Sequence, residues 1–114
     1  MEKFITEDYS MQFDAETATV YCQGIMRLTN KEYKPIIQWL NKIVALGLPK
    51  MTLNLRELRI LNSSGVAMLG IFVSAVDKKK TVQLVIQCSK KTAWQKKSVN
   101  IFQDLMPEVQ MEWE

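Results

Sequence analysis

Two adjacent serines, Ser63 and Ser64, lie between an apolar strand pattern and a long apolar helical pattern. They belong to the turn Asn62-Ser63-Ser64-Gly65, in which asparagine or serine can cap the helix by accepting a backbone N–H bond. A hydroxyl at the N-terminal end of a helix can carry a phosphate, because the helix dipole stabilises negative charge there. Gly65 permits tight packing or the close approach of another chain. The turn is therefore either a structural cap alone or a site of modification.

The helix expected behind this turn, from Ser64 to about Asp77, is apolar over most of its circumference. A surface helix needs an apolar stripe little more than about 100° wide, so this helix has surplus apolar area. Either neighbouring helices cover the surplus or a protein partner binds it. The expected core face contains Val66, Leu69, Phe72, Val73 and Val76; the surplus contains Ala67, Met68, Ile71 and Ala75; the polar stripe contains Gly70, Ser74 and Asp77.

Strand and helix patterns alternate along the rest of the chain. Residues 9–13 and 18–25 predict an antiparallel hairpin, and a helix to Val44 follows it. That helix either begins at the capping box Thr29–Glu32 and is kinked in its first turns by Pro35, or begins near Lys34, where Pro35 would occupy its first position. The remaining strands are expected at 51–61, 82–88 and 109–113, and the remaining helix at 92–105. This order predicts one α/β domain over residues 1–114, with helices packed on a single-layer, mixed, mostly parallel sheet.

Composition excludes several classes of protein. Hydrophobic residues make up 47% and charged residues 24% of the 114 residues, which is typical of a globular domain. The net charge of +3 comes from lysine runs near helix ends, which indicate solvated surfaces and not a nucleic-acid site. No apolar run approaches the roughly 20 residues that span a bilayer, and no secretory signal is visible, so we expect a cytoplasmic protein.

The residue types also argue against an enzyme. The chain has no histidine to act as a near-neutral base, and its four glycines form no phosphate-binding loop. Cys22 and Cys88 lack the spacing of metal ligands, so we expect both to be buried hydrophobic side chains. No metal or cofactor is therefore expected.

One segment resembles a known family. The run Leu53-Asn54-Leu55…Leu58-Arg59-Ile60-Leu61-Asn62-Ser63-Ser64-Gly65-Val66…Leu69 is similar to the central motif of STAS domains, the family of bacterial anti-sigma-factor antagonists. That motif is a strand ending in Asp-Ser-Ser-Gly or a close variant, followed by an apolar helix. Asn62 stands where the family usually has aspartate, so the cap is kept and its charge is lost.

The resemblance implies a role in transcription regulation. Members of the family bind a serine-kinase anti-sigma factor when unphosphorylated; the kinase phosphorylates the first serine of the motif, and a phosphatase removes the phosphate. By position the phosphoacceptor would be Ser63, with Ser64 as the second choice. Two alternatives stay open: a constitutive, unphosphorylated scaffold or transport-complex subunit, and a domain that binds a nucleotide, a lipid or another small ligand.

Overall fold

The structure of the chain, a computed structural model, describes residues 3–114. Its strands form a single six-stranded sheet in the order β1-β2-β3-β4-β5-β6, so each strand lies beside its neighbours in the chain. β1, β2 and β3 pair antiparallel, whereas β3 to β6 are parallel. The elements are β1 (Phe4–Ile5), β2 (Tyr9–Asp14), β3 (Thr19–Met26), α1 (Asn30–Val44), β4 (Lys50–Leu61), α2 (Ser63–Lys79), β5 (Gln83–Cys88), α3 (Ala93–Leu105) and β6 (Gln110–Trp113).

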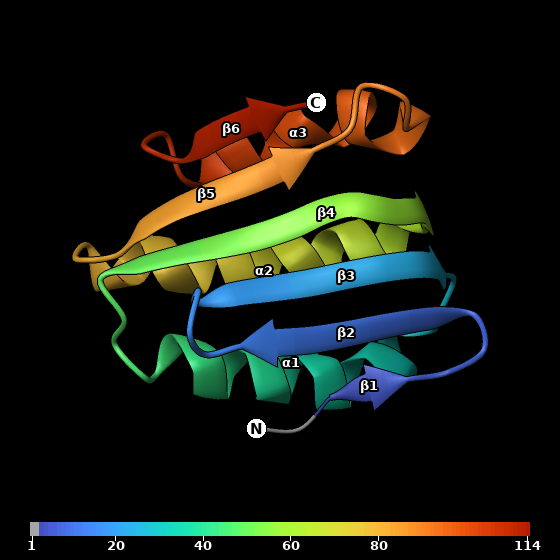
Figure 1. The fold of residues 1–114 in the computed structure, drawn as a ribbon, viewed down its shortest axis with the longest axis horizontal. Coiled ribbons are helices and arrows are strands. Elements are labelled where there is room, and N and C mark those ends of the chain that lie inside the picture. Colours follow the sequence, from blue (N-terminus) through green and yellow to red (C-terminus); the bar gives the residue numbers. More distant parts are fainter. Residues whose placement is uncertain (1–2) are drawn as a thin grey trace.

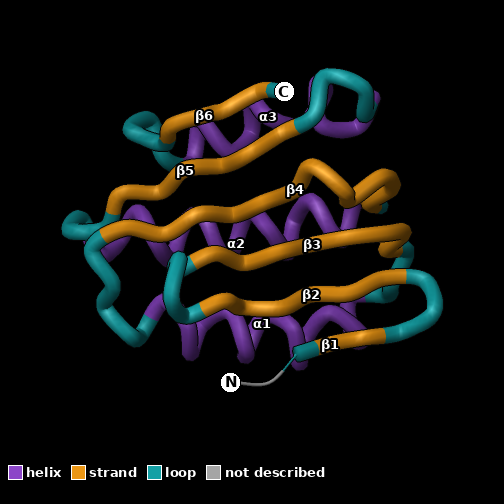
Figure 2. Tube along the Cα trace, viewed as in Figure 1, coloured by secondary structure: helices purple, strands orange, loops and turns teal. Residues whose placement is uncertain are grey.

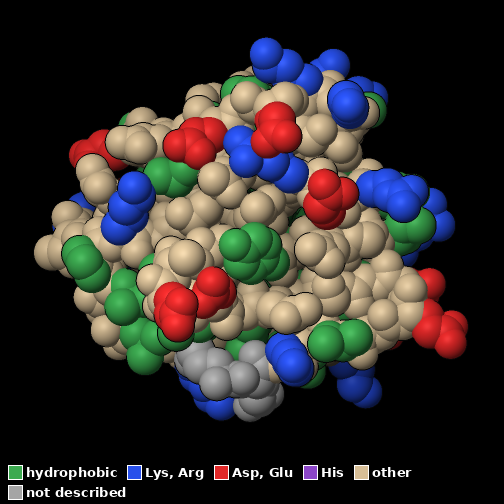
Figure 3. All heavy atoms as spheres, in the orientation of Figure 1, with side chains coloured by type: hydrophobic (Ala, Val, Ile, Leu, Met, Phe, Trp, Pro, Cys, Tyr) green, Lys and Arg blue, Asp and Glu red, His purple; other side chains and the backbone are tan. Residues whose placement is uncertain are grey.

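All three helices cover one face of the sheet (Figure 1). The strand order explains this arrangement. From β3 to β6 the chain always moves toward the same edge, and right-handed crossovers in one direction place every connecting helix on the same side. The other face of the sheet carries no helix, and its side chains are mostly polar. Figure 3 views that face and shows Lys and Arg side chains gathered at the upper right, over α3 and the carboxyl ends of β4 and β5.

Alternation along the strands separates the two faces. In β4, Met51, Leu53 and Leu55 are buried beneath the helices, while Thr52 and Asn54 point to the open face and are half-buried. Val85 of β5 is also on the open face, opposite Thr52 in the register, yet it is only 3% exposed. β5 is therefore an inner strand with apolar residues on both faces.

Near its carboxyl end β4 changes its path (Figure 2). Two shifts in its register against β3 mark β-bulges, each adding one residue to β4. The sequence carries the signal, because the spacing of buried leucines increases from two to three at Leu55, Leu58 and Leu61. Pairing of β4 with β5 stops at Asn54, so the last residues of β4 have only β3 as a partner strand.

The side-chain amide of Gln95 in α3 forms a hydrogen bond with β4 where β5 no longer pairs with it. Gln95 is 2% exposed. Its Nε2 donates to the Leu55 carbonyl at 2.7 Å, and its Oε1 accepts from the Ser89 N–H at 2.7 Å. The Trp94 indole N–H donates to the Leu58 carbonyl at 2.8 Å. Backbone groups that the bulges release from the sheet are thereby paired with the first turn of α3.

The N-terminal half agrees with the sequence in most respects. The hairpin and the capping box are present: the Thr29 hydroxyl accepts from the Glu32 N–H, and the Glu32 carboxylate accepts from the Thr29 N–H. Hydrogen bonding of the Glu32 carboxyl to Thr29, above all to its backbone N–H, holds the pKa of that carboxyl below its usual value. The alternative start near Lys34 is wrong, since α1 begins at Asn30 and continues through Pro35. The sequence missed β1, which adds two residues to the edge of the sheet.

Within residues 3–114, no helix is long and apolar enough to cross a membrane. The same residues contain no cluster of three or more His, Cys, Asp or Glu side chains that could hold a metal ion.

Candidate functional site

Asn62 caps α2 and connects it to two other parts of the chain. Its Oδ1 accepts from the Gly65 N–H at 3.0 Å and from the Tyr33 hydroxyl at 2.7 Å. Its Nδ2 donates to the Leu28 carbonyl at 2.8 Å. The side chain thus joins the start of α2 to α1 and to the loop that follows β3. Of the two residue types expected to cap α2, asparagine or serine, the structure has asparagine in that role.

Tyr33 is a member of this site that the sequence analysis did not identify. Its side chain fits the apolar stripe of α1, and nothing in the chain indicates a hydrogen bond to a residue 29 positions away. Burial raises the pKa of its phenol, although the Leu28 N–H that donates to its oxygen partly opposes the shift. The hydroxyl therefore keeps its proton at neutral pH and remains a donor to Asn62.

The two serines differ in exposure. Ser63 is the first residue of α2 and is exposed, whereas Ser64 is half-buried. The Asn62 side chain makes the capping bond, so the Ser63 hydroxyl is not needed for it. Gly65 is buried in the first turn, where an added Cβ would contact Leu61 and lie 2.6 Å from the Tyr33 hydroxyl oxygen. The turn therefore combines a fixed cap, a closely packed glycine and an exposed hydroxyl.

Replacing Asn62 with aspartate is expected to lower the free energy of unfolding by about 1 kcal/mol. A carboxylate still accepts from Gly65 and Tyr33, but it cannot donate to the Leu28 carbonyl and would repel that oxygen. Urea denaturation of the variant beside Asn30→Asp, which adds the same charge to the exposed first turn of α1, measures the effect. Equal stability of the two variants would contradict the role given to the Leu28 bond.

The burial of residues on α2 differs in part from the prediction. The expectation that Met68 belongs to an accessible surplus is wrong, since its side chain is 1% exposed. Gly70, expected in the polar stripe, is buried as well. The reason is that α2 lies between α1 and α3 and packs on both, so it buries more of its circumference than a helix with one neighbour. A helical wheel does not show how many neighbours a helix has.

The other three residues of the expected surplus remain accessible. Ala67 is exposed, Ile71 is 48% exposed and Ala75 is half-buried. They lie on a groove of about 500 Å³ that begins one turn after Ser63. Its walls come from all three helices: Asn41 of α1, Leu105 of α3, and Ala67, Gly70, Ile71, Ser74, Ala75 and Lys78 of α2.

Both cysteines are free and buried, as the sequence predicts. Burial raises the pKa of the Cys22 thiol to about 12, and burial raises that of Cys88 to about 11 despite the nearby Arg56 charge. Each thiol therefore keeps its proton in the folded chain above pH 9.0, the ordinary thiol value, whereas the unfolded chain releases it.

The thiols are expected to make stability fall in alkaline solution. Their contribution is complete below about pH 9 and is lost as the pH rises toward about 11 to 12, because the folded state then binds more protons than the unfolded state. Urea midpoints measured across this window should decline less steeply for Cys22→Ala than for the unchanged chain. Parallel declines would show that Cys22 does not titrate differently on folding.

Sequence comparison gives no relative: neither models of known protein families nor curated protein sequences match the chain. Solved structures do match. Apo-SiaC from Pseudomonas aeruginosa has a TM-score of 0.74 at 11% identity, over 100% of this chain and 99% of that chain. A chain in the crystal structure of the diguanylate cyclase SiaD in complex with its activator SiaC, also from Pseudomonas aeruginosa, has a TM-score of 0.69 at 16% identity, over 96% and 95%.

A third match is SpoIIAA, a Bacillus cell fate determinant, in its phosphorylated form. It has a TM-score of 0.60 at 16% identity, over 93% of this chain and 90% of that chain. At these identities the likeness concerns the fold. The mixed six-stranded sheet with three helices packed on one face agrees with it. The chain therefore has the STAS-like α/β fold of SiaC and SpoIIAA, which its central motif predicts.

Proposed function

We propose that this chain is a non-enzymatic regulatory module whose protein partner binds along α2 and whose binding is controlled by phosphorylation of Ser63. The observation that carries the proposal is the exposed Ser63 hydroxyl at the start of α2, beside an accessible apolar groove. Two of the matching structures support it, since SiaC is the activator of the diguanylate cyclase SiaD and the SpoIIAA structure is of its phosphorylated form. We place the protein in the cytoplasm, where a kinase and a phosphatase would act on it.

Charge explains how such a switch works without unfolding the domain. A phosphate on Ser63 adds about −1.5 to −2 charge at pH 7. At the N-terminal end of α2 this charge is favourable by about 0.3–1 kcal/mol, because the helix dipole points toward it. The cap stays intact, since it depends on the Asn62 side chain. A partner that fits the neutral hydroxyl must desolvate the phosphate before binding, so its affinity falls.

Two partner classes fit the proposal. The resemblance of the motif favours a serine-kinase anti-sigma factor, and the likeness to SiaC favours a signalling enzyme such as a diguanylate cyclase. Both classes would contact the groove on α2 through Ala67, Ile71 and Ala75. Proteins encoded beside this chain in its genome, purified and mixed with it, distinguish the two.

Phosphorylation is tested first. Incubation with the candidate kinase and ATP should add one phosphate to the unchanged chain and none to Ser63→Ala, because Ser64 is half-buried. Ser64→Ala is the matched control and should be phosphorylated normally. Mass spectrometry of intact protein and of peptides measures the result. Incorporation that persists in Ser63→Ala would assign the phosphate to another residue.

Partner binding is tested on the groove. Ile71→Asp should weaken capture of the partner by at least about tenfold, because it introduces a charge into an apolar contact. Ile5→Asp is the control, since Ile5 is 60% exposed and lies in β1 at the far edge of the sheet. Equal binding by the two variants would contradict the use of α2. Circular dichroism confirms that both variants stay folded.

A further inference from the structure

A second hollow lies at the carboxyl end of β4, beside the loop that follows β5. It is separate from the α2 groove. It has a volume of about 720 Å³, in the size range of small-molecule sites. It exists because the bulges turn β4 away from β5 after Asn54, so the ends of the two strands do not pair. The walls are the end of β4, the loop after β5, the start of α3 and the residue after β6: Arg56, Glu57, Arg59, Ile60, Ser89, Lys91, Thr92, Ala93 and Glu114.

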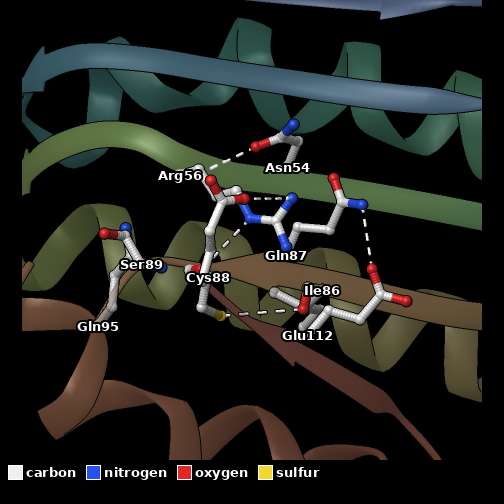
Figure 4. Close-up of polar contacts among 9 residues, drawn as sticks. Asn54, Arg56, Ile86, Gln87, Cys88, Ser89, Gln95 and Glu112 are labelled. Carbon is white, nitrogen blue, oxygen red and sulfur yellow. Dashed lines mark hydrogen bonds and ion pairs between the residues drawn. The ribbon is translucent and has the colours of Figure 1, made fainter. Parts of the chain in front are cut away.

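Three of the lining side chains are cationic: Arg56, Arg59 and Lys91. They come from two separate segments, and Arg59 and Lys91 are exposed, so both can move toward a bound group. Arg56 is more fixed. Its Nε donates to the Cys88 carbonyl at 3.5 Å, and Figure 4 shows the side chain reaching from β4 toward the end of β5. Hydroxyls of Ser89 and Thr92 line the same hollow and could donate to an oxyanion.

The most fixed of these cations, Arg56, already forms an ion pair with a carboxylate. Glu114 Oε2 lies 3.1 Å from an Arg56 terminal nitrogen, and the Glu114 side chain is 73% exposed. An exposed carboxylate on a guanidinium is weakly held, because water and salt compete with it. An incoming anion could therefore replace Glu114 on Arg56 at small cost.

From this geometry we propose that the hollow binds a phosphorylated small molecule, and that Glu114 competes with its phosphate for Arg56. Two arginines and a lysine suit phosphate, since guanidinium groups form paired hydrogen bonds with its oxygens. The volume leaves room for an attached sugar or base beyond the phosphate, beside the apolar Ile60 and Ala93 side chains. The proposal does not depend on phosphorylation of Ser63, so Ser63→Ala should bind the same ligand with unchanged affinity.

Calorimetry and NMR titration test binding directly. The probes are inorganic phosphate, ribose 5-phosphate, AMP and adenosine, each taken to millimolar concentration at low salt. The three phosphates should bind saturably, adenosine should not, and amide shifts should concentrate at 56–60 and 89–94. AMP binding more tightly than inorganic phosphate would identify a nucleotide-type ligand, and equal binding would identify free phosphate. Absence of saturable phosphate binding, or equal binding of adenosine and AMP, overturns the proposal.

Charge variants test the residues. Arg59→Gln should weaken AMP binding by about tenfold, as expected for loss of a charged hydrogen bond. Lys50→Gln removes the same charge at the opposite end of β4 and should change the affinity by less than about twofold. Equal effects of the two variants would show only a long-range charge effect and would overturn the assigned site.

If Glu114 competes with the phosphate for Arg56, removing its charge should raise the affinity for AMP, whereas Arg59→Gln lowers it. Glu114→Gln should tighten AMP binding by about fivefold, because Arg56 loses its competing carboxylate. Glu112→Gln is the matched control, since Glu112 lies in β6, two residues before Glu114, and bonds to Gln87 and not to Arg56. If Glu114→Gln binds AMP no more tightly than Glu112→Gln does, Glu114 is not a competitor and the proposed use of Arg56 fails.

Discussion

Replacing Gln95 with methionine is expected to lower the free energy of unfolding by about 2–5 kcal/mol. The methionine has a similar size but cannot pair with the Leu55 carbonyl or the Ser89 N–H, which both lie beside the buried amide. Each unpaired buried group costs about 1–3 kcal/mol. Urea denaturation followed by circular dichroism gives the free energy, and an unchanged slope would show that only stability changed.

The control for this change is Gln87→Met. Gln87 lies in β5, the strand beside β4. Its amide donates to Glu112 at 3.1 Å on the exposed face of the sheet. Loss of that exposed bond should alter stability by less than about 0.5 kcal/mol. Similar losses in the two variants would contradict the view that the Gln95 amide replaces a strand partner for β4.

Gly65→Ala is expected to lower the free energy of unfolding by about 1–3 kcal/mol, the range for overpacking a core. The added methyl group would contact the buried Leu61 side chain and lie 2.6 Å from the Tyr33 hydroxyl oxygen. Tyr33 cannot move away without giving up its 2.7 Å bond to Asn62. Thermal and urea unfolding of the variant measure the loss.

Gly70→Ala provides the comparison within the same helix. Its added methyl group would lie 3.2 Å from a terminal methyl of Leu105, which is 36% exposed and can rotate. Alanine is favoured over glycine in a helix interior by about 1 kcal/mol, so this variant should be as stable as the unchanged chain or more stable. If both glycine variants were equally tolerated, close packing at the start of α2 would not be what requires Gly65.

Most of the fold could be predicted because the spacing of apolar residues along the chain directly indicates strands and helices. The two-residue spacing of Met51, Leu53 and Leu55 predicts a strand with one buried face, and the turn at Asn62 predicts a helix start. The change to a spacing of three at Leu58 and Leu61 also indicates the bulges, but they were not predicted from it. β1 was not predicted, since two residues are too short for any pattern.

The site was predicted less completely, for two physical reasons. The burial of Met68 depends on α1 and α3 packing on both sides of α2, and a pattern within one helix cannot reveal that. The partners of Asn62 and Gln95 are backbone groups or side chains distant in sequence, such as Tyr33 and Leu55. Such hydrogen bonds follow from tertiary structure and leave no local spacing to detect. The start of α2 beside Ser63, by contrast, could be predicted to within one residue, because the neighbouring residues define the cap.

The sequential strand order has a consequence for how the chain folds. No strand has to insert between two others that are already paired, since each adds to the edge formed by the strand before it. Closing each short crossover loses little chain entropy, which favours rapid folding for a sheet of this kind. During synthesis the sheet can grow from β1 toward β6 as the ribosome releases each unit, and β6 completes it last.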